Sequence, residues 1–180
     1  MPVMIALLRG INLAGHHKIK MDALRALCES LGLRDVQTHL QSGNVVFKTT
    51  ARDAAALRKR FEAAIEREFG FHSDVILRTP EELQSAAERN PFVNRPDMNP
   101  SRLVVHFLCA DPAAECCAAV RKIRAEPEEL HLDGRELYIY FPNGMARPNL
   151  SMPLLEKTLK TSGTSRNWNT VCKLLEMCEA

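Results

Sequence analysis

Donor-rich polar side chains gather in three short blocks of this 180-residue chain, each where the backbone is expected to change direction. The blocks span residues 7–12, 41–44 and 164–170. Guanidinium, ammonium and amide groups suit an anionic or amide-bearing ligand, although they serve equally well in ordinary caps and turns. The candidate ligand-binding residues in and beside these blocks are Arg9, Asn12, Lys18, Gln41, Ser42, Asn44, Arg166 and Asn167.

The first block opens a basic loop. No acidic residue occurs between Met1 and Met21, while Arg9, Lys18 and Lys20 follow an apolar run. A glycine-bracketed basic loop after a strand can cradle an anion, but the spacing matches neither a Walker loop nor a dinucleotide fingerprint. The alternative is a solvated loop in which the glycines permit positive φ.

The other two blocks also have two interpretations. Gln41, Ser42 and Asn44 flank a predicted hairpin turn, where they either bond the backbone locally or point into a cleft. Thr164 or Ser165 is expected to cap a last helix over 167–178, which places Arg166 and Asn167 at a helix N-terminus that attracts anions.

Composition narrows the class of protein. Hydrophobic content of 46%, charged content of 26% and a net charge of +2 are ordinary for a globular protein and argue for no particular partner. No apolar run approaches the ~20 residues of a membrane span, and Val3 to Leu8 is too short for a signal peptide. We therefore expect a cytoplasmic protein without a membrane partner.

The six cysteines form no C-x-x-C pair, which favours reduced thiols without a disulfide. Adjacent Cys116 and Cys117 leave soft-metal binding or oxidation open, but no ligand cluster stands beside them, so no metal site and no cofactor are predicted. No motif assigns catalytic residues. His39, His106 and His131 lie in predicted strands, where each is either a base or a structural group, so catalysis stays open.

The order of apolar patterns along the chain predicts the elements that position these residues. The first part shows, in order, a strand, a helix, a hairpin, a second helix and a strand. These elements span Val3 to Arg9, Met21 to Leu31, Val36 to Leu40 with Val45 to Phe47, Leu57 to Phe69, and Asp74 to Arg78. This β-α-β-β-α-β order is that of a ferredoxin-like unit.

The rest of the chain repeats most of that order. A capped helix begins at Thr79, and 90–100 is a proline-rich linker or lid candidate. A strand over Leu103 to Cys109, a helix from Asp111, a hairpin around Asp133-Gly134 and two final helices follow. We predict an α+β fold of two ferredoxin-like β-α-β-β-α units, a structural duplication with antiparallel sheets covered by helices. The predicted ranges are 1–78, 79–100 as the connection, and 101–180.

Several motifs match a known family. They include residues 7–12 with Gly15 and Lys18, 41–47, 90–92, Tyr138 with 140–142, Gly144, and 166–170. On these motifs the chain resembles the bacterial domain of unknown function 1697 family. The resemblance implies two ferredoxin-like halves and brings no established activity.

The leading functional hypothesis is a binding module for a phosphorylated small molecule or nucleic acid, acting through a basic cleft. In this hypothesis Arg9, Asn44, Arg166 and Asn167 line one cleft. The alternatives are a transferase or hydrolase that uses the same cleft, and a protein-interaction scaffold in which the motif residues only hold the fold together.

Overall fold

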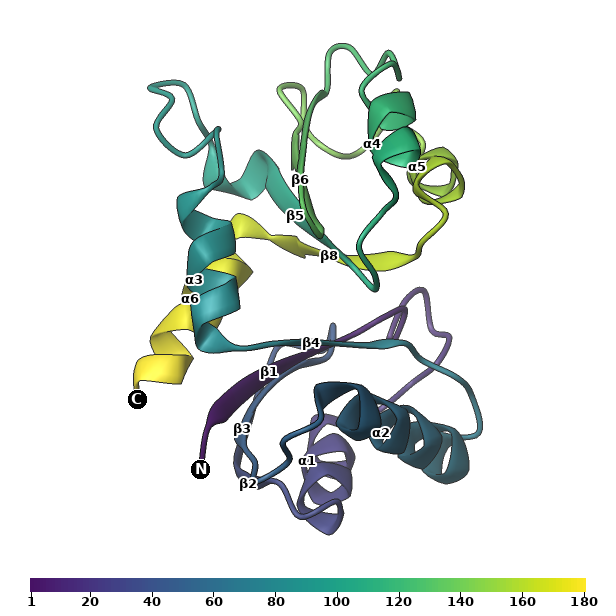
Figure 1. The fold of residues 1–180 in the computed structure, drawn as a ribbon, viewed down its shortest axis with the longest axis vertical. Coiled ribbons are helices and arrows are strands. Elements are labelled where there is room, and N and C mark those ends of the chain that lie inside the picture. Colours follow the sequence, from purple (N-terminus) through teal and green to yellow (C-terminus); the bar gives the residue numbers. More distant parts are fainter. The chain divides into compact units, whose positions relative to one another are not determined.

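The computed structural model describes residues 1–180, and contacts divide the chain into two compact units (Figure 1). The first comprises Met1–Gln84 with Leu174–Ala180, and the second Ser85–Lys173. The helices α3 (Pro80–Glu88) and α6 (Trp168–Glu179) each contribute residues to both units. The predicted ranges follow element order instead of contacts and stay a prediction. None of the helices is long and apolar enough to cross a membrane.

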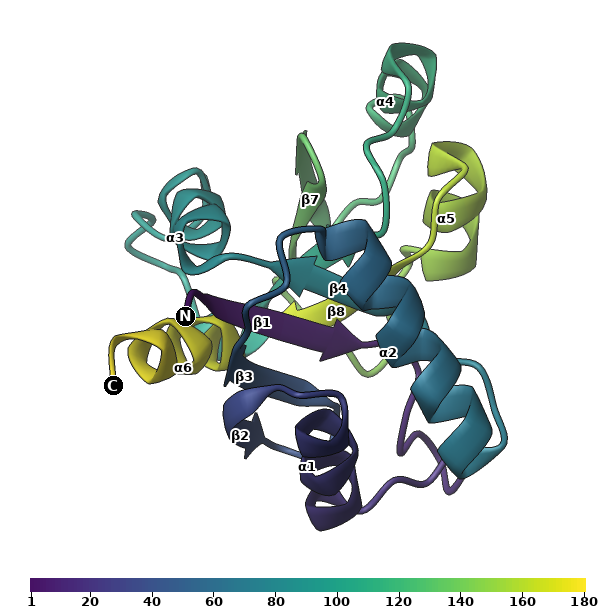
Figure 2. The ribbon, with the colours of Figure 1, turned by 60° about the horizontal axis from the view of Figure 1, so that its bottom comes forward.

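The first unit contains the predicted β-α-β-β-α-β order. Its elements are β1 (Val3–Leu8), α1 (Met21–Ser30), β2 (Arg34–His39), β3 (Asn44–Lys48), α2 (Ala54–Phe69) and β4 (Val75–Arg78). The antiparallel sheet has the strand order β2-β3-β1-β4. Figure 2 shows α1 and α2 on one face of this sheet.

Alternation along β1 explains which face the helices cover. Met4, Ala6 and Leu8 belong to one buried core, together with Leu24 of α1 and Phe61 of α2. Helix α2 has both predicted end signals. The Asp53 carboxylate accepts a hydrogen bond from the Ala56 N–H, and Gly70 ends the helix in the left-handed region. These signals fix where α2 begins and ends, and its buried residues pack it against the sheet.

The second unit repeats the first, so the predicted duplication is confirmed. Its elements are β5 (Leu103–Leu108), α4 (Ala114–Val120), β6 (Glu129–Asp133), β7 (Glu136–Tyr140), α5 (Met152–Leu159) and β8 (Gly163–Asn167), preceded by a 3₁₀ turn, η1 (Pro100–Arg102). The strand order β6-β7-β5-β8 corresponds strand for strand to that of the first sheet. Strands β1 and β5 occupy the same central position.

The start of the last helix differs from the prediction. Residues 163–167 form strand β8, which pairs with β5 from Val104–Asn167 to Leu108–Gly163, and α6 begins only at Trp168. Asn167 supplies the cap, because its Oδ1 accepts a hydrogen bond from the Asn169 N–H. The sequence Gly-Thr-Ser-Arg-Asn carries no apolar alternation, so the strand depends on pairing with β5 instead of on a pattern of its own.

The proline-rich segment is anchored to the second sheet. The Phe92 ring stacks on Tyr140 with centroids 6.0 Å apart, and Arg95 Nη1 lies 2.8 Å from a carboxylate oxygen of Glu129. The preceding helix α3 lies on the same face, since the Tyr138 hydroxyl donates to the Ala86 carbonyl at 2.6 Å. The segment therefore covers the face of the sheet opposite α4 and α5.

Candidate anion-binding site

A cavity of about 690 Å³ opens in the first unit between the 9–20 loop, the start of α1 and the β2–β3 turn. Three of the predicted ligand-binding residues line it, namely Asn12, Lys18 and Gln41. The complete lining is Asn12, Gly15, Lys18, Ile19, Lys20, Met21, Asp22 and Gln41.

The 9–20 loop has an unusual backbone. Its left-handed residues are Gly10, Asn12, Ala14, Gly15 and His17, with φ between 47° and 80°. Non-glycine residues reach this region only where the surrounding structure holds them there. Two backbone hydrogen bonds do so, from Asn12 N–H to the His17 carbonyl at 3.0 Å and from His16 N–H to the Leu13 carbonyl at 2.8 Å.

Asn12 braces the loop against the rest of the unit. Its Nδ2 donates to the carbonyls of Ile19 at 3.0 Å and Gln41 at 2.7 Å, and its Oδ1 accepts from the Ile19 N–H at 2.9 Å. Both amide hydrogens are thus committed to backbone oxygens. Asn12 shapes the wall of the cavity and joins the loop to the β2–β3 turn.

Helix α1 begins at the cavity without a side-chain cap. Lys20 occupies the N-cap position with φ −73° and ψ 138°, and its side chain accepts no hydrogen bond. Met21 and Asp22 of the first turn line the cavity, and the Asp22 carboxylate pairs with Arg25. The first N–H groups of a helix carry a partial positive charge that attracts anions. The exposed side chains of Lys18 and Lys20 add two full charges beside them.

The β2–β3 turn supports the opposite wall. A Cβ at Gly43 would lie 2.7 Å from Ile11 Cδ1 and 2.8 Å from Leu8 Cβ, so only glycine fits there. Asn44 is fully buried, and its Nδ2 donates to the His39 carbonyl at 2.7 Å and to Ser42 Oγ at 3.0 Å. Asn44 and Ser42 therefore hold the turn, whereas the exposed Gln41 side chain is free to reach the cavity.

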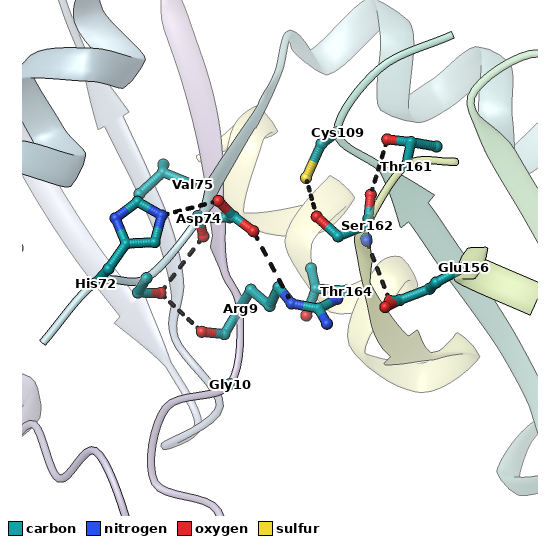
Figure 3. Close-up of polar contacts among 12 residues, drawn as sticks. Arg9, Gly10, His72, Asp74, Val75, Cys109, Glu156, Thr161, Ser162 and Thr164 are labelled. Atoms are coloured by element: carbon teal, nitrogen blue, oxygen red, sulfur yellow. Dashed lines mark hydrogen bonds and ion pairs between the residues drawn. The ribbon is translucent and has the colours of Figure 1, made fainter. Parts of the chain in front are cut away.

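Arg9 lies at the end of β1 in a separate polar cluster, shown in Figure 3. Its Nε is 3.9 Å from Asp74 Oδ2, and its carbonyl accepts a hydrogen bond from Ser73 Oγ at 2.7 Å. The other Asp74 oxygen lies 3.0 Å from His72 Nε2. This hydrogen bond raises the pKa of His72 above its usual value.

Arg166 and Asn167 belong to the second unit. The Arg166 side chain is buried, with Nη1 donating to Thr164 Oγ1 at 2.7 Å and to the Ser165 carbonyl at 2.9 Å. Burial lowers its pKa to about 10. Asn167 Nδ2 donates to the Ser101 carbonyl at 3.2 Å. The shared cleft of Arg9, Asn44, Arg166 and Asn167 stays a prediction.

The duplication contains an arginine equivalent to Arg166. Arg78 on β4 pairs with Ile5, the third residue of β1, just as Arg166 pairs with Val105, the third residue of β5. Arg78 is also buried, and its Nη1 donates to the carbonyl of its preceding residue, Leu77, at 3.0 Å. Both arginines therefore occupy one position of the repeated framework.

Lys20 was named in the basic loop but not among the candidate ligand-binding residues, and the start of α1 was not predicted as part of the site. Their signal was present as the basic 9–20 loop followed by a helix, but the missing cap is visible only in the backbone geometry. The second unit offers a direct comparison. Between β5 and α4 it has only residues 109–113, with Asp111 in the connection and Glu115 in the first turn of α4. The long basic loop belongs to the first copy alone.

Comparisons with other proteins agree with the fold. The structure is similar to that of the conserved bacterial protein SP0830 from Streptococcus pneumoniae, with a TM-score of 0.74 and 23% sequence identity. The match covers 100% of this chain and 99% of that chain. A search of curated proteins finds no match. The model of the family described as "Protein of unknown function (DUF1697)" matches residues 1–138, and the chain therefore belongs to the DUF1697 family.

Proposed function

We propose that the first unit binds a small phosphorylated molecule, with the phosphate at the N-terminus of α1 between Lys18 and Lys20. The observation that carries this proposal is the uncapped start of α1, which opens into a cavity flanked by these two exposed lysines. Backbone N–H groups and the helix dipole favour an anion at such a position.

The size and composition of the cavity support a small ligand. Its volume of about 690 Å³ lies within the roughly 300–1,000 Å³ range of small-molecule sites. The apolar side chains of Ile19 and Met21 and the amide of Gln41 can contact the remainder of such a molecule. The lining contains one carboxylate, that of Asp22, and no histidine, which favours binding over proton-transfer chemistry.

The internal duplication gives independent support. Both α1 and α4 begin without a side-chain cap, but only α1 follows a long basic loop with a braced, left-handed backbone. Backbone strain of this kind is concentrated at ligand sites. Because the two copies share one framework, the loop is an addition that the framework itself does not need.

The test is calorimetric titration of the full chain with inorganic phosphate and mononucleotides, using Lys18→Ala and Lys20→Ala. Lys59→Ala is the matched control, since Lys59 is exposed on α2 and does not line the cavity. A charge-assisted hydrogen bond contributes about 1.5–3 kcal/mol, so each cavity variant should weaken affinity by roughly 10- to 100-fold.

Equal affinities for wild type, both cavity variants and Lys59→Ala would contradict the proposal. A single-stranded oligonucleotide provides the second arm. If it binds far more tightly than a mononucleotide, with an affinity that falls steeply with salt, the ligand is nucleic acid instead of a small molecule.

A further inference from the structure

In the second unit, a hydroxyl, an imidazole and a carboxylate from three different elements lie next to one another, with the imidazole in the middle. His106 Nδ1 of β5 is 2.8 Å from Ser165 Oγ of β8. His106 Nε2 is 3.4 Å from Glu156 Oε1 of α5. The His106 side chain is 3% exposed, whereas Ser165 is exposed. A buried base thus lies directly behind an accessible hydroxyl.

The strand register produces this contact. Cys109 N–H donates to the Ser162 carbonyl at 2.8 Å, and hydrogen-bonded pairs alternate along an antiparallel ladder. His106 and Ser165 therefore form a non-hydrogen-bonded pair, the kind in which opposite side chains come closest. In such a pair the Ser165 N–H points away from β5, and because β8 is an edge strand no further strand of the sheet accepts it.

Glu156 and Gly163 complete the arrangement. Glu156 Oε1 also accepts a hydrogen bond from the Gly163 N–H at 3.3 Å, which orients the carboxylate (Figure 3). A Cβ at Gly163 would lie 2.7 Å from His106 Nε2 and 2.4 Å from the Phe107 carbonyl oxygen. Because Gly163 has no side chain, the His106 imidazole has room to lie between Ser165 Oγ and Glu156 Oε1.

We propose that Ser165 is a nucleophile activated by His106, with Glu156 as the positioning residue, and that it reacts with carboxylic esters. A nucleophile within hydrogen-bond reach of a base, and a base oriented by a third group, are the geometric signs of such a site. The proposal concerns the second unit and does not rest on the anion site.

The proposed reaction is ester hydrolysis, which needs only these side chains and water. With its proton on Nε2, facing Glu156, His106 accepts the Ser165 hydroxyl proton at Nδ1 while Oγ bonds to the acyl carbon. The ester C–O bond then breaks, and the leaving alkoxide takes the proton from the imidazolium. Water then attacks the acyl carbon while His106 accepts its proton. The bond to Oγ breaks, the proton returns to the serine, and the carboxylic acid is released. The outward Ser165 N–H is a donor for the oxyanion.

The experiment is labelling of the full chain with a fluorophosphonate, whose fluoride leaves as the serine oxygen bonds to phosphorus, followed by peptide mass mapping. We expect modification of Ser165 in the wild type and its loss in Ser165→Ala. Ser101→Ala is the control, because Ser101 is exposed but its hydroxyl donates to Asn99 instead of facing a histidine. General-base catalysis contributes about 10²- to 10⁴-fold, so His106→Gln should slow labelling by at least about tenfold.

Thermal unfolding is measured alongside the labelling rate. Because His106 is buried, Glu156→Gln is a second variant that keeps the shape of the side chain and removes its charge. Glu156→Gln should show a cooperative thermal unfolding transition, which means that it is folded, and should still be labelled more slowly than Ser101→Ala. An unlabelled Ser165, or equal labelling rates in wild type and Glu156→Gln, would overturn the proposal.

Discussion

The polar side chains of the first unit have different roles, and their contacts show which role each has. The amides of Asn12 and Asn44 are committed to backbone carbonyls, whereas the ammonium groups of Lys18 and Lys20 are exposed around the cavity. The sequence identified the polar residues as candidates but could not separate these roles. That distinction depends on side-chain hydrogen bonds that residue type does not reveal, such as the bond from Asn12 to the Gln41 carbonyl, 29 residues away.

Because Asn12 braces the loop, we expect that replacing its side chain lowers the stability of the fold. Asn12→Ala deletes three hydrogen bonds and places alanine at φ 54°. We expect the free energy of unfolding to fall by about 1–3 kcal/mol in urea denaturation. Ala14→Gly is the matched change, because it relieves a residue at φ 47° and should raise stability by up to about 1 kcal/mol. No loss in Asn12→Ala would show that the loop is not braced by this amide.

The contact of His72 with Asp74 predicts a pH dependence. Since the hydrogen bond to Asp74 raises the pKa of His72 in the folded chain, the pair stabilises the fold fully below the unfolded-state pKa. This stabilisation is lost as pH rises through the folded-state pKa. In Asp74→Asn the His72 pKa should return towards its ordinary value, as an NMR titration of the ring protons would show. An unchanged pKa would mean that Asp74 is not the cause.

At the scale of elements, order and spacing predicted both ferredoxin-like units, because each helix has an apolar stripe and most strands have apolar runs. Strand β8 escaped the prediction, since its five residues contain no aliphatic side chain and it forms only through pairing with β5. The end of α1 is similar in kind. The basic 9–20 loop marked this region, but the missing side-chain cap at the helix N-terminus is visible only in the backbone geometry.

The close fit of β8 against β5 predicts a strict requirement for glycine. Gly163→Ala introduces a Cβ that meets both backbone and imidazole, and overpacking of this kind costs about 1–3 kcal/mol. Gly10→Ala is the comparison, because at φ 67° it has strained backbone but nothing within 4 Å of the new atom. Thermal melts should show the larger loss for Gly163→Ala. A smaller loss than in Gly10→Ala would show that β8 and His106 move apart easily.

At the scale of the whole molecule, one framework occurs twice and each copy carries its own addition. The first copy has a basic loop at the start of α1, and the second has the line of Ser165, His106 and Glu156. The two copies can differ in this way because the strand order and the helices over each sheet are the same, while the connections and edge strands vary. The two proposed activities are therefore separable by mutation.

The most direct test of the anion site is an amide NMR titration of the full chain with inorganic phosphate. We expect the largest shifts at the N–H groups of residues 20–22, with no comparable shift at Ala114 or Glu115, where α4 also begins without a side-chain cap. Equal shifts at both helix starts, or shifts confined to other regions, would contradict it.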